Sequence, residues 1–312
     1  MGHDEQLLLT GDCILAILFT QQCATAVTRV SNIVIDTSDL QIAEQPIGQG
    51  SSGVVRQGLY KGVHKVAVKE LTGVFAKGSQ MHGMFRREAL SLISCAHKNV
   101  LKFYGVCLSP DQNIWIVTKL MQGGSLLDYL SKKKGLPTCE IIKLAKDIAK
   151  GMRFLHSKGI LHMDLKAANV FLDEGNAVIG DLGIARLVNE KVGDNPQIGT
   201  YRWMAPEVSA QAMLDSTAQS SNWFSYKTDV YSYGILLWEL LTCQLPFSEY
   251  SPVQAAVGVV MHGVRPPIPA STFPPLRCLI QKCWDQNPSN RPDFTQVLEM
   301  LRIISLHADR TS

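Results

Sequence analysis

The chain has 312 residues, of which 46% are hydrophobic and 18% charged, and its formal net charge is +3. This length suits one large two-lobed domain or two small ones, and the composition excludes an intrinsically disordered chain. The small positive charge does not indicate binding to nucleic acid or to an anionic membrane, so we expect neither partner. The function has to be argued from motifs.

Residues 1–38 are predicted to be an N-terminal flank, either helical or poorly ordered. Its apolar run at 13–19 is far shorter than the roughly 20 residues that a transmembrane helix needs. The first ten residues contain no Lys or Arg, unlike a secretory signal, and Gln6 stands where a myristoylation signal prefers Ser or Thr. We predict a flanking helix and no membrane span, with a targeting role as the less favoured alternative.

The eight cysteines are scattered, with no C-x-x-C pair and no Cys/His cluster at metal-ligand spacing. Cys107 and Cys243 follow apolar runs, where a thiol behaves as a small buried hydrophobic group. This usage predicts reduced structural thiols and a cytoplasmic protein.

The pattern of apolar residues divides the chain into two parts. Residues 33–120 are rich in strand-like runs, interrupted by one predicted helix at 84–94. Helical spacing then dominates, and a glycine pair before Ser125 indicates a hinge followed by a helix start. We therefore predict an α+β fold, with a small β-rich lobe and a larger helical lobe that form a ligand-binding cleft. The predicted helices of the second part are 141–156, 229–242, 253–262 and 294–304.

A glycine-rich segment, Gly48-Gln49-Gly50-Ser51-Ser52-Gly53, is the first motif that indicates a ligand. Glycines let backbone N–H groups approach a phosphate without a Cβ in the way. The pattern is weak by itself, because the dinucleotide-binding turn of an oxidoreductase has the same glycines. In that turn the third glycine opens a helix, whereas residues 54–58 here read as a strand, which argues against an oxidoreductase.

Lys69 ends the next predicted strand, after the run Val66-Ala67-Val68. A lysine on a strand that follows a glycine-rich hairpin can place its ammonium group on nucleotide phosphates. Such a lysine needs a carboxylate to hold it, and Glu88 in the predicted helix at 84–94 is the candidate.

Three further motifs follow in order: His162-Met163-Asp164-Leu165-Lys166-Ala167-Ala168-Asn169, then Asp181-Leu182-Gly183, then Ala205-Pro206-Glu207. Together with the glycine-rich segment and Lys69, they resemble the catalytic loop and the flanking motifs of protein kinases. The resemblance implies a bilobal protein kinase fold, with one main helix in the β-rich lobe. The oxidoreductase alternative shares only the glycine-rich segment and leaves residues 162–207 unexplained, so it is rejected.

The resemblance implies a role for each matching residue in the transfer of the ATP γ-phosphoryl group to a protein hydroxyl. Asp164 would accept the hydroxyl proton, and Lys166 would balance charge on the phosphoryl oxygens. Lys69, held by Glu88, would contact the phosphates. Asn169 and Asp181 would bind Mg²⁺, with Mn²⁺ as an alternative. The ATP-binding residues would be Ile47, Gly48, Gly50, Gly53, Val55, Ala67, Lys69, Thr118, Met121 and Phe171.

The motifs also indicate which kinases the chain resembles. Lys166, two residues after Asp164, is typical of serine/threonine kinases, whereas the segment 199–207 resembles the tyrosine-kinase-like group, as in Raf-type, mixed-lineage and plant kinases. The likeness pairs Glu207 with Arg291. It implies a serine/threonine kinase in intracellular signalling, with protein substrates, and leaves tyrosine as a second target, homodimer formation and scaffold contacts open. The predicted kinase domain is 39–303 (N-lobe 39–121, C-lobe 122–303), followed by a C-terminal tail at 304–312.

Two departures from the family pattern bear on regulation. Met163 replaces the arginine that in the family pairs with a phosphorylated residue of the activation loop. The loop itself, 184–198, contains no Ser, Thr or Tyr. We therefore expect activity that does not depend on phosphorylation of this loop. The alternatives are weakened activity and a pseudokinase scaffold that binds ATP without efficient transfer. A polar stretch at 208–227 is predicted to be a solvated loop, with a docking role as the alternative.

Overall fold

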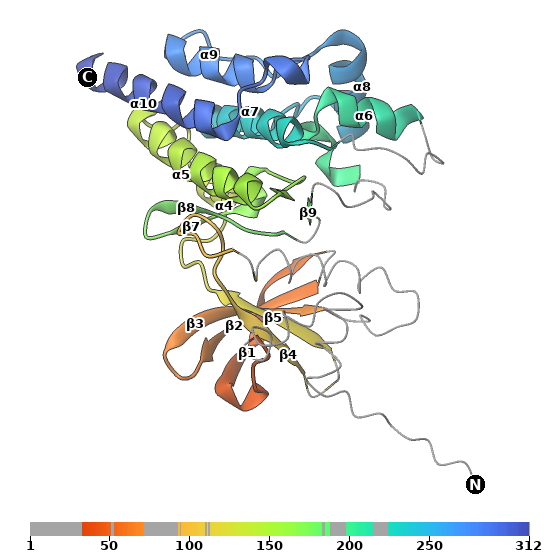
Figure 1. Cartoon of the computed structure of the whole chain (residues 1–312), viewed down its shortest axis with the longest axis vertical. Helices are drawn as coiled ribbons and strands as arrows, with labels where there is room; N and C mark the ends of the chain where they lie inside the picture. The colour runs from red at the N-terminus through yellow and green to blue at the C-terminus, as the bar shows by residue number, and fades with distance from the viewer. Residues whose placement is uncertain are drawn as a thin grey trace. The chain divides into compact units, whose positions relative to one another are not determined.

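The structure is a computed structural model, which describes residues 33–50, 53–71, 93, 95–109, 111, 113–182, 185–187, 198–214 and 224–311. The chain divides into two compact units. The first unit comprises the residues up to Ala96 and Leu101–Leu120, and the second comprises His97–Val100 and the residues from Met121 onward. The first is mainly a β-sheet and the second mainly helical (Figure 1), so the predicted α+β fold class is confirmed.

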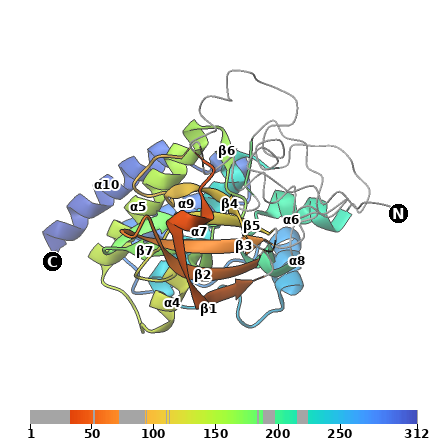
Figure 2. The same ribbon diagram turned by 90° about the horizontal axis from the view of Figure 1, so that it is seen from below.

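The first unit is built on a five-stranded antiparallel sheet with the strand order β1-β2-β3-β5-β4. Strands β1, β2 and β3 lie side by side in Figure 2. Alternate residues of β3 point to opposite faces, which buries Val66 and Val68 against Ile35, Cys107 and Val117. The strands are β1 (Leu40–Gly50), β2 (Gly53–Tyr60), β3 (His64–Leu71), β4 (Phe103–Leu108) and β5 (Ile114–Lys119), and a short 3₁₀ helix, η1 (Thr37–Asp39), precedes them.

The glycine-rich segment forms the hairpin between β1 and β2, in which Gly50 pairs with Gly53. Gly53 has a φ of +132°, and a Cβ at this position would lie 2.1 Å from the carbonyl oxygen of Glu70. Only glycine is tolerated there. The chain continues as strand β2, as predicted, and the helix of a dinucleotide-binding turn does not follow.

The second unit is organised around α7, which is buried over most of its length. Helix α10 packs along α5, and α5 also packs against the β7–β8 hairpin (Figure 1). The helices are α4 (Leu126–Ser131), α5 (Thr138–Ser157), α6 (Pro206–Leu214), α7 (Tyr226–Thr242), α8 (Pro252–His262), α9 (Pro274–Cys283) and α10 (Phe294–Thr311). The short elements are β6 (Ile160–Leu161), β7 (Val170–Asp173), β8 (Asn176–Ile179), β9 (Arg186–Leu187), η2 (Ala167–Asn169), η3 (Ile198–Trp203) and η4 (Pro288–Asn290).

All four helices predicted from the apolar spacing of the second part are present as α5, α7, α8 and α10. Ser125 caps α4, because its hydroxyl accepts a hydrogen bond from the backbone N–H of Asp128 at 3.1 Å, which confirms the predicted helix start. Helix α10 continues to Thr311, through most of the segment taken as a tail. The helix predicted at 84–94 and the N-terminal flank up to residue 32 lie outside the described residues, except for Ile93.

The prediction of a solvated loop at 208–227 is wrong for the part that the structure describes. Helix α6 extends to Leu214 and buries Val208 and Ser209, and Ser225 caps the start of α7. Helix α6 was missed because its segment is polar in composition. A short helix needs only one buried face, which takes few apolar residues. Helix α9 was not among the predicted helices.

The cysteines match the prediction only in part. The structure describes Cys95, Cys107, Cys139, Cys243, Cys278 and Cys283, and no disulfide joins any two of them. Cys107 is buried as expected, but Cys243 is half-exposed and occupies the left-handed C-cap of α7, with a φ of 55°. The apolar run ends with the helix, one residue before this thiol. None of the helices that the structure describes combines the length and hydropathy needed to cross a membrane.

Candidate active site

Three predicted residues of the second unit lie together on the segment between β6 and β7. The ammonium group of Lys166 donates to both carboxylate oxygens of Asp164, at 2.9 Å and 2.8 Å. The Asn169 side-chain amide donates to the Asp164 backbone carbonyl at 2.8 Å and to its Oδ2 at 2.7 Å. Charge-assisted hydrogen bonds of this kind are strong and hold a carboxylate in one orientation.

His162 and Met163 give this segment its shape. His162 is fully buried, and its Nδ1 accepts from the backbone N–H of Asp164 at 3.2 Å while its Nε2 donates to the carbonyl of Gly180 at 3.1 Å. The imidazole thus joins the segment that carries Asp164 to the one that carries Asp181. Met163 has a φ of 67°, a left-handed conformation that a methionine adopts only under constraint from its surroundings.

Asp229, in the first turn of α7, supplies part of that constraint. Its two carboxylate oxygens accept the backbone N–H groups of His162 and Met163, each at 2.9 Å. The imidazole of His156, on α5, lies 2.8 Å from the same carboxylate. Burial alone would raise the pKa of Asp229, but the hydrogen bond and charge of His156, with the backbone N–H of His162, lower it below the usual value. The buried carboxylate is therefore ionised, and it fixes the loop through the backbone N–H groups of His162 and Met163.

Glu239, near the end of α7, reaches the other side of the same segment. It accepts the backbone N–H of Ala167 at 3.2 Å and the indole N–H of Trp203 at 2.8 Å. Burial raises the pKa of this carboxyl to about 8, and the bonds from Trp203 and Ala167 and the charge of Lys166 offset only part of the rise. One carboxyl thereby connects the loop of Asp164 to η3, and the Lys166 ammonium lies 5.9 Å from the centre of the Trp203 ring.

Asn169 and Asp181 carry hard oxygen donors of the kind that Mg²⁺ prefers. Because both hydrogen bonds of the Asn169 amide come from its nitrogen, its oxygen is the atom left to act as a ligand. Asp181 is half-buried and has a left-handed φ of 52°. Mg²⁺ usually binds one or two protein carboxylate or amide groups and completes its shell with water and phosphate oxygens, so these residue types fit that ion.

In the first unit, the predicted nucleotide-binding residues lie on adjacent strands. Lys69 on β3 is opposite Val55 on β2, and Ala67 on β3 is opposite Thr118 on β5. The Thr118 side chain is 8% exposed, and its hydroxyl donates to the carbonyl of Ala67 at 3.4 Å. The predicted partner of Lys69, Glu88, lies outside the described residues.

The remaining predicted residues are distributed over both units. Ile47 is exposed on β1, which also carries Gly48 and Gly50. Met121 is the first residue after the first unit, and Phe171 is on β7, where it forms a bridge with Ser125.

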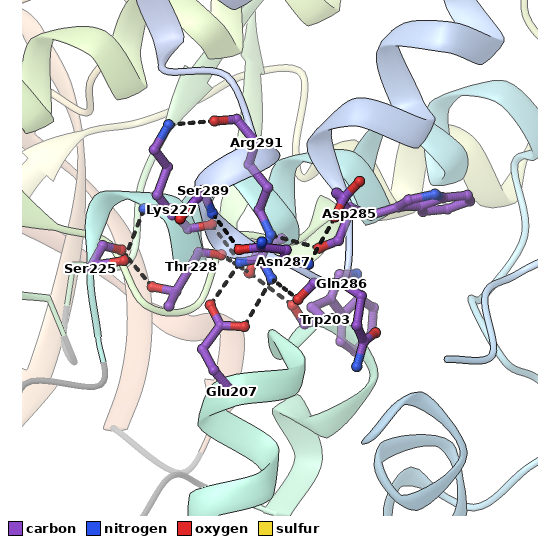
Figure 3. A network of polar contacts seen from close by, with 12 residues as sticks. Trp203, Glu207, Ser225, Lys227, Thr228, Asp285, Gln286, Asn287, Ser289 and Arg291 are labelled. Carbon is purple, nitrogen blue, oxygen red and sulfur yellow. Dashed lines mark hydrogen bonds and ion pairs between the residues drawn. The ribbon is translucent and has the colours of Figure 1, made fainter. Parts of the chain in front are cut away.

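An ion pair in the second unit joins Arg291, which is buried, to Glu207 on α6, which is partly exposed (Figure 3). Both terminal nitrogens of the Arg291 guanidinium donate to the carboxylate of Glu207, at 2.7 Å and 2.8 Å, which confirms the predicted pair. Arg291 is 1% exposed and also donates to the carbonyls of Lys227 at 3.0 Å and Asp285 at 2.8 Å. Each of these hydrogen bonds is donated by the charged guanidinium of Arg291. Together they fix the N-terminus of α6 to the start of α7 and to the segment before α10.

The sequence analysis assigned no role to Asp229, Glu239, Trp203 or His156. Asp229 and Glu239 are acidic residues within an otherwise apolar helix, a pattern that indicates a buried polar contact without naming its partner. Asp229 binds the backbone N–H of His162, 67 residues away, and Glu239 binds that of Ala167, 72 residues away. Contacts over such a separation are visible only in the folded chain.

Comparison with known proteins agrees with this arrangement. Residues 41–301 match the family described as protein tyrosine and serine/threonine kinase. The chain is 42% identical to serine/threonine-protein kinase STY17 of Arabidopsis thaliana over 86% of this chain and 45% of that protein. It is 38% identical to serine/threonine/tyrosine-protein kinase HT1 of the same plant over 82% of this chain and 65% of that protein.

A human relative, serine/threonine-protein kinase TNNI3K, is 34% identical over 87% of this chain and 32% of its own length. The chain thus spans less than half of the STY17 protein and about a third of TNNI3K. The matched range of 41–301 includes the glycine-rich hairpin, Lys69 and the loop of Asp164. The chain therefore belongs to the protein kinase family, within its tyrosine-kinase-like serine/threonine branch.

Proposed function

We propose that this protein transfers the γ-phosphoryl group of Mg·ATP to serine and threonine hydroxyls of protein substrates. The observation that supports it most is the cluster in which the Asp164 carboxylate lies 2.8 Å from the Lys166 ammonium and 2.7 Å from the Asn169 amide. A carboxylate held in this way can orient a hydroxyl and accept its proton, while the lysine balances charge on the phosphoryl oxygens.

The other residues would position the nucleotide. Lys69, with Glu88, would contact the phosphates, and the backbone N–H groups of the glycine-rich hairpin would cover them. Asn169 and Asp181 would hold Mg²⁺, which, when bound, neutralises charge on the phosphate oxygens. The adenine would contact Val55, Ala67 and Phe171, with Thr118 and Met121 beside it.

The extent of the domain and its cellular location are also proposals. The kinase domain would cover residues 39–303, which contain every residue named in the proposed reaction. That no disulfide joins any two of the described cysteines supports a reducing compartment, and hence the cytoplasm.

The test is Mg·ATP-dependent phosphorylation of a generic protein substrate, followed by phosphoamino-acid analysis. Asp164→Asn keeps the size of the side chain and removes the base, so we expect a loss of at least about 100-fold in turnover. Its thermal unfolding temperature and ATP affinity serve as controls for folding. Equal turnover by the wild type and Asp164→Asn, with ATP bound by both, would instead favour the pseudokinase scaffold.

We further propose that activity does not require a phosphorylated activation loop. Met163 offers no cation for a phosphate, and its backbone N–H is already bonded to Asp229. Phosphatase treatment is expected to leave turnover unchanged within about twofold. A loss of activity that returns only with a phosphate on residues 184–201 would contradict this proposal. Weakened activity, the other alternative, predicts that Met163→Arg raises turnover.

A further inference from the structure

The face of α5 that points away from the core carries a row of cations. Lys143, Lys146, Lys150 and Arg153 follow one another at spacings of three or four residues and so share one side of the helix. Lys143 and Arg153 are exposed, and the other two are half-exposed. The opposite side of α5 is buried, so the row is a separate surface feature.

This arrangement is unfavourable for the helix itself. Like charges three or four residues apart repel each other and destabilise a helix. Asp147 compensates part of the charge, at 3.7 Å from the Lys143 ammonium and 3.2 Å from that of Lys150. Within the part of the chain that the structure describes, Lys146 and Arg153 form no hydrogen bond or ion pair. The charged groups of these two cations therefore remain available to an external anion.

His97 lies at the end of this row and is affected by the same local positive charge. Its ring stacks on Phe154 of α5 with the ring centres 4.9 Å apart, next to the end of the row. Burial lowers the pKa of His97, and the charges of Lys98, Arg153 and Lys150 lower it further. The cations therefore act together on one point of the surface.

We propose that this basic stripe (Lys143, Lys146, Lys150 and Arg153, with His97 and Lys98 at its end) is a docking surface for an extended acidic segment of a partner protein. The net charge of +3 did not indicate a charged partner, because a charge averaged over the whole chain conceals a local cluster of cations. It does not rest on phosphoryl transfer.

The surroundings favour an acidic peptide over an anionic membrane. From residue 143 to residue 153 the stripe is roughly 15 Å long, which is the span of about five extended residues. Glu174, exposed in the β7–β8 turn, is next to Gly175, whose carbonyl accepts from Lys143. A flat anionic membrane that covered the stripe would also approach the carboxylate of Glu174, and the two negative charges would repel each other. No large exposed apolar side chain of the described part of α5 is available for insertion into lipid.

The experiment measures binding of a fluorescein-labelled peptide of about ten glutamates to the full chain at low salt, without ATP. The test variant is Lys146→Gln/Arg153→Gln. The control is Lys132→Gln/Lys134→Gln, which removes the same charge from the exposed segment between α4 and α5. We expect the test variant to bind about tenfold more weakly and the control to change by less than about twofold.

Two further measurements locate the peptide and identify the class of ligand. Bound carboxylates should raise the pKa of His97 in an NMR titration, since they offset the neighbouring cations. Equal losses in both variants, or no binding by the wild type, would overturn the proposal. Binding to vesicles of anionic phospholipid with the same dependence on Lys146 and Arg153, but not to the peptide, would overturn it in favour of a membrane surface. Because ATP is absent, none of these outcomes depends on catalysis.

Discussion

Two carboxyl groups on α7 hold the same loop from opposite ends of the helix, yet their protonation differs. Asp229 and Glu239 are both almost completely buried. Asp229 accepts two backbone N–H groups and lies beside His156, which lowers its pKa, whereas Glu239 accepts two donors with no imidazole beside it and has a pKa of about 8. Asp229 is also in the first turn of the helix, where the dipole favours an anion. The partners, and not burial alone, decide whether a buried carboxyl is ionised.

The largest effect that follows from this comparison is expected for Asp229→Asn. The substitution removes the buried charge and turns an NH₂ group toward groups that donate, so at least one donor loses its acceptor. We expect the free energy of unfolding to fall by about 3–5 kcal/mol, as for one partner removed from a buried pair. Urea unfolding followed by circular dichroism measures it. Glu174→Gln, at an exposed position of the same unit, is the matched control, and a loss no larger than the control's would contradict the prediction.

A second prediction concerns pH, for which the two carboxyls act in opposite directions. The folded-state pKa of Glu239 is raised from 4.5 to about 8, so the folded state holds more protons than the unfolded state between these values. Its contribution to stability is full below the unfolded pKa and is lost as the pH rises toward about 8. For Asp229 the pKa is lowered, so its contribution is lost as the pH falls below 3.8.

Glu239→Gln isolates the first of these contributions. Between about pH 6 and pH 8 the wild type should lose roughly 2 kcal/mol of unfolding free energy relative to this variant. Urea unfolding of both proteins across this range measures the difference. Parallel profiles would mean that Glu239 is already ionised at the lower pH.

The smallest effect is expected for Trp203→Phe, which removes one of the two donors to Glu239. We expect a loss of about 1 kcal/mol in unfolding free energy and a further rise in the pKa of Glu239. Trp238→Phe removes an indole bond to the carbonyl of Pro267 at 2.8 Å and leaves the hydrogen bonds that Glu239 accepts from Ala167 and Trp203 in place. Both variants should therefore lose similar stability, but only Trp203→Phe should move the pH dependence. If both variants shifted the pH dependence of stability, that dependence could not be assigned to Glu239.

The parts of the site that were predictable are those whose residues are close in sequence. Asp164, Lys166 and Asn169 lie within six residues of one another, and a short loop has few ways to separate them. The pair Glu207–Arg291 spans 84 residues and was predicted only because the likeness to protein kinases carries tertiary information. The helix α6 was missed, because a helix held by one buried face has little signal in a polar segment.

The sequence by itself determined the strand-rich and helix-rich halves, the glycine hairpin and the types of residue available for phosphoryl transfer. These depend on periodicity, on backbone sterics at a position such as Gly53, and on the chemistry of side chains within one loop. Only the tertiary structure decided that Asp229 is ionised, that Glu239 links Ala167 to Trp203, and that His97 lies beside the cations of α5. Each of these depends on donors, charges and desolvation that come from segments far apart in the chain, which no local pattern of residues encodes.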